Sequence, residues 1–302
     1  MPRRRYIIAV DEHSFLPGSA LAWKEAIKRF VAGLRPDDLA GLYAYPVGGP
    51  LVPLTEDRQV LLNGVDRIVG RLEIPRHQYN MSLSEAIDIT AGDVEVAQRV
   101  AQRECSRPDQ IHCVNRALPG QARMMTTDVE MLVSQSIGGL RTLMRSLKEM
   151  PDRKTVVVVS GGMMAGDRVG GRINLNAEIW EAGREASEAN VNLYVLHLDT
   201  SFLEMFSARN KVLVSQLRDV ELRAQGIARF AGAGGGELIR VQAGTGDDAF
   251  RRVLRETSAY YLLSVDVEER DRKDRAQKIK VKTSRRNAIV RHREWAVVPV
   301  SR

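Results

Sequence analysis

RKTVVVVSGG, from Arg153 to Gly162, is the stretch that decides the fold. It begins with charged residues, continues through a run of valines and ends in a serine and two glycines. An unbroken β-branched run without polar alternation is typical of a strand buried on both faces, and therefore of a parallel sheet covered by helices. Such sheets bind ligands outside the carboxyl ends of their strands, where glycine turns allow close approach. The residues that end this strand are therefore the first candidates for a functional site.

A second buried strand is predicted near the start of the chain. YIIAV, from Tyr6 to Val10, is a short apolar run that ends in the polar cluster DEHS at 11–14. Apolar residues then recur at helical spacing until Pro36, so a helix follows the strand. Because parallel strands end at the same edge of a sheet, we expect Asp11 to face the end of the 153–162 stretch.

The remaining elements alternate along the chain. Further strands are expected at 39–45, 51–54, 191–198 and 237–241, with a hairpin joining the first two. Further helices are expected at 57–69, 83–100, 129–147, 176–189 and 247–258, with another that ends near 231. This order predicts an α/β fold with a Rossmann-like, doubly wound, mostly parallel sheet flanked by helices. The glycines at 232–236 follow a helix and precede a strand, which favours a helix cap over a phosphate-binding loop.

The C-terminal part follows a different pattern. A β-hairpin extension is expected from Tyr260, which divides the chain into a main domain at 5–258 and an extension at 259–298 packed on or near it. Lys278, Lys280 and Lys282 alternate with apolar residues, as on a solvent-facing strand protected by lysine. This basic stretch, which includes Arg285 and Arg286, carries much of the net charge of +7. Nucleic-acid binding is therefore an alternative function, although no aromatic residues are interleaved with the cations.

The composition is that of an ordinary globular protein, with 302 residues, 44% of them hydrophobic and 27% charged. No apolar run approaches the roughly 18 residues that span a bilayer, and the N-terminus lacks the pattern of a signal peptide. Strand-like sequence begins only five residues from the start, as it would in an N-terminally truncated fragment. The sequence alone leaves the localisation open.

Two cysteines, Cys105 and Cys113, lie eight positions apart in a polar segment that contains Pro108. They would close a small disulfide ring in an oxidising compartment and remain free thiols in a reducing one. His112 beside Cys113 suggests zinc, but the chain lacks four well-spaced ligands for that ion. The sequence does not decide between the disulfide and the free thiols.

Catalytic motifs are absent from the sequence. The histidines are scattered, and neither a zinc-protease helix, a nucleophile elbow nor a phosphate-binding loop is found. A hydrolase alternative would use Asp11 and His13 beside Ser14 or Ser160. Neighbouring residues of a loop point in different directions, however, and nothing orients the histidine as a catalytic triad requires. The sequence therefore predicts no catalytic residues and no enzyme.

Five features in this order resemble a von Willebrand factor type A (VWFA) domain: Asp11 at the end of the first strand, PDRKTVVVVSGG, NVNLYVLHLD, IARFAGAGGGELI and SAYYLLSV. More narrowly, the chain resembles the bacterial "VWFA-related" domain family described from Acidobacteria. The resemblance extends from about residue 5 to residue 298 and is most specific at 151–159 and 259–263. It implies a Rossmann-like fold, a protein ligand of unknown identity and an extracytoplasmic setting.

The resemblance also implies a divalent metal at the carboxyl edge of the sheet. The family holds it with a D-x-S-x-S loop, a threonine loop and an aspartate after the fourth strand. Asp11 matches the first position, but His13 and Phe15 stand at the two serine positions. Ser14 lies one step out of register and is the nearest hydroxyl.

The other two metal loops also depart from the family pattern. The threonine position falls on Met81, between Asn80 and Ser82, and the aspartate position is Gly161, after Ser160. Methionine, phenylalanine and glycine side chains offer no oxygen to Mg²⁺. The predicted ligands of Mg²⁺ or another divalent cation are therefore an irregular set: Asp11, Ser14, Ser82 and Ser160. These observations predict a non-enzymatic protein-binding module with a degenerate metal-ion-dependent adhesion site.

Overall fold

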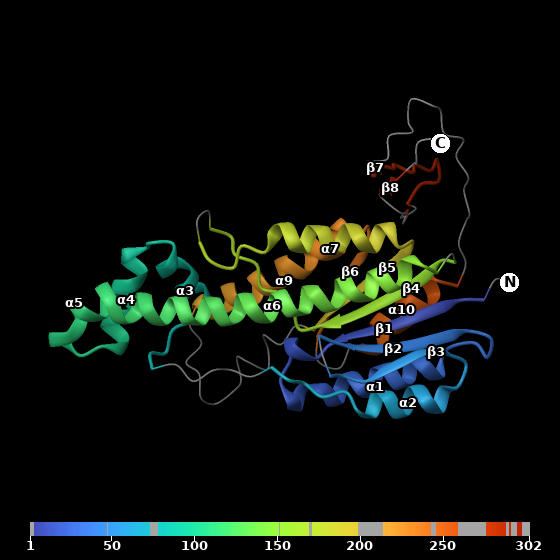
Figure 1. Ribbon diagram of the computed structural model, residues 1–302, viewed down its shortest axis with the longest axis horizontal. Helices are drawn as coiled ribbons and strands as arrows, with labels where there is room; N and C mark the ends of the chain where they lie inside the picture. Colours follow the sequence, from blue (N-terminus) through green and yellow to red (C-terminus); the bar gives the residue numbers. More distant parts are fainter. Residues whose placement is uncertain are drawn as a thin grey trace.

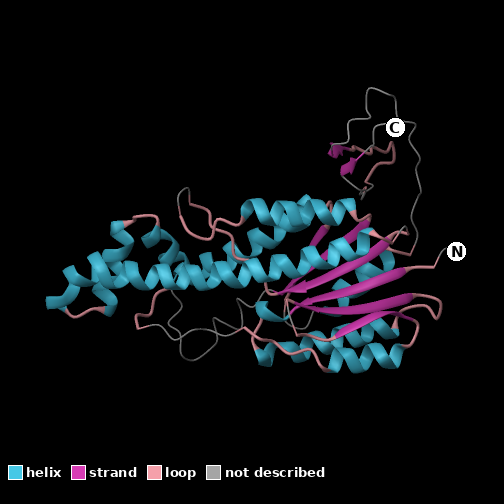
Figure 2. Cartoon of the chain, in the orientation of Figure 1, coloured by secondary structure: helices cyan, strands magenta, loops and turns pink. Residues whose placement is uncertain are grey.

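The computed structural model describes residues 3–46, 48–72, 78–150, 152–168, 171–198, 214–242, 246–258, 276–287, 290 and 295–297. Its centre is a six-stranded sheet in the order β3-β2-β1-β4-β5-β6. Only β3 runs antiparallel to its neighbour, and the other pairs are parallel. Figure 2 shows this sheet between two layers of helices. The predicted Rossmann-like, doubly wound and mostly parallel sheet is therefore confirmed.

The strands form where the sequence has its buried runs. β4 (Lys154–Ser160) is buried at every position and lies between β1 (Arg5–Asp11) and β5 (Val191–Leu198). β2 (Leu39–Tyr45) and β3 (Leu51–Thr55) form the predicted hairpin. β6, the strand at the opposite edge, consists of Glu237–Val241. Because β1, β4 and β5 are parallel, their last residues lie together at the carboxyl edge of the sheet.

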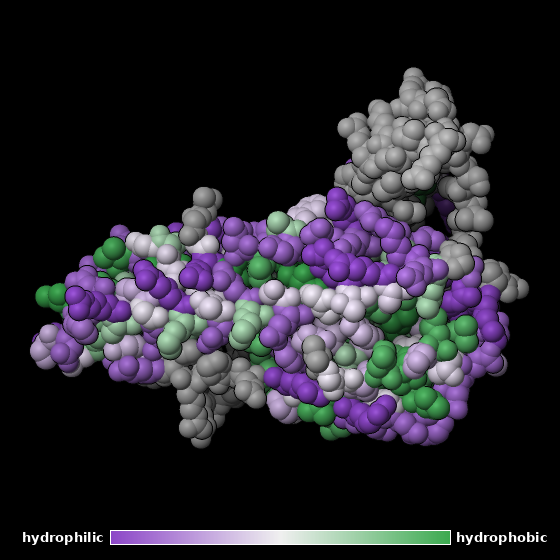
Figure 3. Space-filling model, in the orientation of Figure 1, coloured by the Kyte–Doolittle hydropathy of each residue, from purple (hydrophilic) through white to green (hydrophobic). Residues whose placement is uncertain are grey.

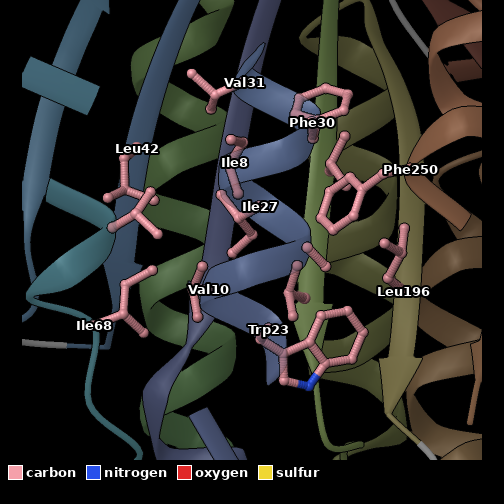
Figure 4. Close-up of a cluster of buried hydrophobic side chains, with 14 of the residues drawn as sticks. Ile8, Val10, Trp23, Ile27, Phe30, Val31, Leu42, Ile68, Leu196 and Phe250 are labelled. Carbon is pink, nitrogen blue, oxygen red and sulfur yellow. The ribbon is translucent and has the colours of Figure 1, made fainter. Parts of the chain in front are cut away.

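One face of the sheet packs against α1 (Ala20–Ala32), α2 (Arg58–Asp66) and α10 (Gly246–Glu256). Figure 4 shows the apolar side chains that α1 inserts between the strands and α10. Among them, the rings of Phe30 and Phe250 have centroids 5.0 Å apart. This face is a continuous apolar core, as expected for a strand layer covered by amphipathic helices.

The other face is covered by α6 (Leu118–Lys148), α7 (Asn176–Glu188) and α9 (Val214–Ala233), and α3 (Leu83–Thr90) packs against α6 and α9 beyond the end of the sheet (Figure 1). α9 ends in the glycine run, where Gly235 has a φ of +64° and the Gly236 N–H donates to the Ala231 carbonyl at 2.8 Å. This is a left-handed helix cap, as the sequence predicts.

The helical segment around α3 differs from the prediction. One helix is expected at 83–100, but Gly92, with a φ of +91°, separates α3 from α4 (Val94–Glu104). Asp93 then caps α4 by accepting a hydrogen bond from the Val96 N–H at 3.1 Å. The pattern of apolar residues continues across the break, which is why it reads as one helix.

Cys105 and Cys113 form a disulfide, which decides the question that the sequence left open. The segment around them is helical rather than a polar loop, with α5 (Gln110–His112) followed by a π-helical turn that leads into α6. α6 consequently begins at Leu118 and not near Val129. Together with α4, these elements form an arm that projects from the sheet (Figure 1).

The described C-terminal residues form a short antiparallel pair, β7 (Ala276–Lys278) and β8 (Trp295–Val297). The lysines at 278, 280 and 282 are exposed and Ile279 and Val281 are half-buried, so the side chains alternate as predicted, but β7 ends at Lys278 and the residues from 279 to 282 are not in a strand. The expected strand at 260–263 lies outside the described residues, and the boundary between 258 and 259 stays a prediction. No helix in the described part of the chain is long and apolar enough to cross a membrane.

Figure 3 shows that the visible face is largely hydrophilic, with hydrophobic side chains over β3 and near the tip of the arm. Leu51 of β3 is 64% exposed, and Ile111 of α5 is 77% exposed. Single exposed apolar residues of this kind are normal on a protein surface.

Candidate functional site

Asp11, the last residue of β1, is the centre of the candidate site and is only 1% exposed. Its Oδ1 accepts a hydrogen bond from Ser136 Oγ at 3.0 Å, and its Oδ2 accepts one from Ser160 Oγ at 3.2 Å. Burial raises the pKa of Asp11 to about 7, although the two serine hydroxyls and the His13 backbone oppose the shift. The carboxyl group therefore titrates near neutral pH inside the fold.

Ser14 joins the loop after β1 to the loop after β4. Its Oγ donates to the Asp11 carbonyl at 2.8 Å and accepts from the Gly161 N–H at 2.7 Å. A Cβ placed on Gly161 would lie 2.1 Å from the Ser14 carbonyl oxygen, far inside van der Waals contact. Glycine at 161 is therefore required by the position of Ser14, and the aspartate of the family pattern does not fit there.

Glu12 holds the same loop from the other side and is 1% exposed. Its Oε1 accepts a hydrogen bond from the Val69 N–H at 2.7 Å, and its Oε2 pairs with Arg71 Nε at 2.9 Å. The backbone N–H of Arg71 also donates a hydrogen bond to the backbone carbonyl of Glu12 at 2.6 Å. Glu12 cannot be recognised from the sequence, because a carboxylate directly after a strand is typical of an exposed loop residue.

Ser136 is a second residue that the sequence analysis missed. It lies on the buried face of α6 among Val133, Ile137 and Leu140, and is separated from Asp11 by 125 positions. The only signal in the sequence is a hydroxyl residue within the apolar face of a predicted helix. Such hydroxyls commonly donate a hydrogen bond to a carbonyl of their own helix. The partner of Ser136 therefore cannot be read from the sequence.

Ser82 belongs to a different set of hydrogen bonds. It is the N-cap of α3, where its Oγ accepts from the Glu85 N–H at 3.2 Å and Glu85 Oε2 accepts from the Ser82 N–H at 2.9 Å. Asp219 of α9 reaches the same helix start and accepts from the N–H groups of Leu83 and Ser84 at 3.0 and 2.7 Å. The loop predicted to supply a metal ligand is thus bound to α9 and to its own helix.

The oxygen atoms of the site fit Mg²⁺ poorly. Asp11, Ser14 and Ser160 come together, but they supply a single carboxylate whose two oxygens already accept hydrogen bonds. Phe15 and Met81, at the serine and threonine positions of the family, are buried core residues at 1% and 7% exposure. In the described ranges, no three His, Cys, Asp or Glu side chains are grouped so that they could hold a metal ion. An octahedral site needs more oxygens than this arrangement offers.

Two further polar side chains continue the row across the sheet. Tyr45 of β2 pairs with Asp11, and His197 of β5 pairs with Ser160. Burial raises the pKa of Tyr45 well above its ordinary value, and the charge of Asp11 adds to the shift. All four side chains are at most 2% exposed. A nucleophile must reach its substrate, and Ser160, at 0% exposure, is not placed to do so.

Beside this buried row the carboxyl edge opens into a pocket of about 100 Å³. Asp11 and Ser136 lie at its base, apolar residues of α6 and of the loop after β4 form its walls, and His13 and Arg223 add polar groups. The pocket is the accessible part of the site.

The mostly parallel sheet, with Asp11 at the carboxyl end of β1, is the Rossmann-like arrangement that the resemblance implies. Among solved structures, it is similar to the crystal structure of the SpRpn10 VWA domain, with 11% identity and a TM-score of 0.37. That match covers 87% of this chain and 100% of that chain. No family model and no curated protein sequence matches the chain. The assignment of a Rossmann-like fold therefore rests on the order and direction of the strands.

Proposed function

We propose that the chain is a non-enzymatic protein-binding module whose metal-ion-dependent adhesion site is degenerate. The observation that carries this proposal is the use of the Asp11 carboxylate inside the fold, where hydroxyls of Ser136 and Ser160 occupy both oxygens. The family resemblance implies a protein ligand at the carboxyl edge. With the carboxylate engaged internally, capture of that ligand proceeds through side chains and not through a metal.

The hydrolase alternative is less well supported. The Ser14 hydroxyl donates to the Asp11 carbonyl and accepts from Gly161, and the Ser160 hydroxyl donates to Asp11 from a fully buried position. A serine nucleophile needs both access and a histidine base within hydrogen-bond reach. The nucleic-acid alternative depends on the exposed lysines at 278, 280 and 282. Exposed lysines are expected just as often on a solvated surface that binds no nucleic acid.

The first test is site-specific photo-cross-linking in cells that make the protein. A benzophenone amino acid is placed at Leu16, which is 42% exposed in the loop after β1, and as a matched control at Asp37, which is exposed before β2 at the opposite edge. We expect a discrete protein adduct from position 16 and none from position 37, with no change on chelation of divalent ions. Adducts of equal yield from both positions, or none from position 16, would contradict a protein-binding carboxyl edge.

The second test concerns the metal. Calorimetric titration of the purified protein with Mg²⁺, Mn²⁺ and Ca²⁺ is expected to give no saturable heat. Asp11→Ala serves as the comparison, because it removes the one carboxylate of the site. Saturable binding to the natural chain that disappears in this variant would show that the adhesion site is functional and not degenerate.

A further inference from the structure

The disulfide between Cys105 and Cys113 lies in the arm, which has an apolar cluster of its own. Cys113 is 4% exposed and packs there with residues of α4 and α6, and the two clusters that hold the sheet contain neither cysteine. The two cysteines are separated by eight positions, so the bond closes only a short ring. Cleavage of the disulfide therefore acts on the arm and not on the core of the sheet.

One end of the disulfide is open to solvent. Cys105 is half-buried at the C-cap of α4, and residues 106–109, which follow it in the ring, are exposed. A thiolate must approach a sulfur of the disulfide in order to exchange with it. Attack is therefore directed at Cys105 and not at the buried Cys113.

The segment before α3 takes its backbone hydrogen bonds from the arm. Gln121 of α6 is 7% exposed, and its Oε1 accepts from the N–H groups of Gln78 and Tyr79 at 3.1 and 3.2 Å. Its Nε2 donates to the Tyr79 carbonyl at 3.0 Å. The hydroxyl of Tyr79 lies 3.8 Å from Cys113 Sγ. This segment therefore rests on the disulfide itself.

The last turn of α4 holds the next residue of the same segment. Glu104 Oε2 accepts a hydrogen bond from the Asn80 N–H at 3.1 Å, and the Arg103 guanidinium donates to the Asn80 carbonyl at 2.6 Å. Both of these α4 residues directly precede Cys105. Helix ends fray, and the disulfide ties this end covalently to the turn that leads into α6. Loss of the bond consequently loosens the contacts of Asn80.

Leu83 connects the arm to the pocket at the carboxyl edge. Its side chain packs against the apolar cluster of the arm and against the core between the sheet and α6, and it lines the pocket. Its N–H group donates to Asp219 of α9 at 3.0 Å and is independent of the arm. A change in the arm can therefore move the side chain of Leu83 while its backbone stays in place.

We propose that the disulfide between Cys105 and Cys113 is a redox switch for ligand capture at the carboxyl edge. The intact bond holds residues 78–80 and the Leu83 side chain in the binding arrangement, and reduction releases them. The inference rests on the proposed protein-binding function and names its regulation.

The reductant in this switch is a dithiol. One of its thiolates attacks Cys105 Sγ, and Cys113 leaves as a thiolate that takes up a proton. The second thiol of the reductant then displaces Cys105 from the mixed disulfide. Two electrons are transferred, so that the reductant ends as a disulfide and the protein carries two thiols.

Amide hydrogen exchange tests the structural part of the switch. It is measured by NMR on isotope-labelled protein before and after reduction with dithiothreitol. We expect the amides of residues 78–80 to exchange about tenfold or more faster after reduction, because their partners lie on the arm. The methyl resonances of Leu83 should shift. Exchange at the amides of Leu83 and Ser84 should not change, because both donate to Asp219.

Three variants follow the path of the effect. Cys105→Ser combined with Cys113→Ser should show the faster exchange without reductant and no response to it. Glu104→Ala removes the acceptor of the Asn80 N–H, so Asn80 should exchange rapidly in both redox states. Glu95→Ala is the matched control, because Glu95 is exposed at the opposite end of α4, and it should keep the response to reductant.

Cross-linking from position 16 tests the functional part. The discrete adduct should be lost in the double serine variant and kept in Glu95→Ala, with circular dichroism as the check that both are folded. If the double variant does not fold, the exchange measurement on the reduced natural chain decides.

Unchanged exchange at residues 78–80 after reduction would overturn the proposal. An adduct of equal yield in the folded double variant would also overturn it and would keep the protein-binding function. No adduct from position 16 in either the natural chain or the double variant would reject both the switch and that function.

Discussion

Replacing Asp11 by asparagine removes a buried carboxyl group whose pKa is raised into the neutral range. The ordinary value for this group is 3.8, and in the folded protein it is about 7. Between these two pH values the folded chain keeps a proton that the unfolded chain has lost. Stability must therefore fall as the pH rises through this window, and it levels off above pH 7. The difference of about three pKa units corresponds to about 4 kcal/mol.

Asparagine is a suitable probe because it preserves the shape and most of the hydrogen bonds. Its oxygen can accept from Ser136, and its amide can donate to Ser160, whose hydroxyl lies 3.4 Å from the Gly162 carbonyl and can turn toward it. The neutral amide has no charge to bury at high pH. We therefore expect the variant to be similar to the natural protein near pH 4 and more stable at pH 8, by up to about 4 kcal/mol.

Urea unfolding at a series of pH values from 4.5 to 8.5, in buffer with a chelator, measures this difference. The readout is the change in unfolding free energy between the two proteins as a function of pH, since other titrating groups contribute equally to both. Asp37→Asn, at an exposed position on the opposite edge, is the control and should give a constant difference. A constant difference for Asp11→Asn as well would refute the reasoning, because it would mean that Asp11 is already ionised in the folded protein.

Three further predictions concern the contacts around this site and the arm. Gly161→Ala should destabilise the protein by about 2 kcal/mol because its Cβ would meet the Ser14 carbonyl at 2.1 Å, whereas Gly138→Ala on the open face of α6 should stabilise it by up to about 1 kcal/mol. Thermal unfolding of the pair checks the opposite signs, and a loss of stability in both would contradict the assignment. Lys154→Met should cost about 2 to 3 kcal/mol in urea unfolding, because the buried Nζ donates to the carbonyls of Leu147 and Met150 at 2.8 and 2.6 Å. Lys148→Met, which breaks only a surface pair with Glu188, should cost less than about 1 kcal/mol, and equal costs would contradict the stability assigned to the buried hydrogen bonds of Lys154. Replacing Cys105 and Cys113 by serine should make the arm more sensitive to proteolysis and cost about 2.5 kcal/mol, given their separation of eight positions, while unchanged cleavage would mean that the helices alone hold the arm.

The local patterns of the sequence predict most of the fold. The four consecutive valines of β4, the apolar run of β1 and the glycines after α9 each specify an element through its own composition. The break at Gly92 was harder to see, because the apolar spacing of α3 continues into α4 and one glycine does not by itself end a helix. The helical turns between Cys105 and Cys113 were missed for a related reason, since polar residues and a proline are typical of loops.

For the candidate site as well, some features follow from the sequence and others only from the tertiary structure. The sequence by itself determined which residues end the strands, and the direction of parallel strands places Asp11 and Ser160 at one edge. Only the tertiary structure decided what surrounds them: Ser136 arrives from α6, Glu12 turns inward to Val69 and Arg71, and Ser14 takes the space that a side chain at 161 would need. The physical reason is the separation along the sequence of the residues that interact. Strands and helices follow from side chains a few positions apart, whereas the hydrogen bonds that engage the Asp11 carboxylate join residues more than a hundred positions apart and exist only once the sheet and α6 have packed.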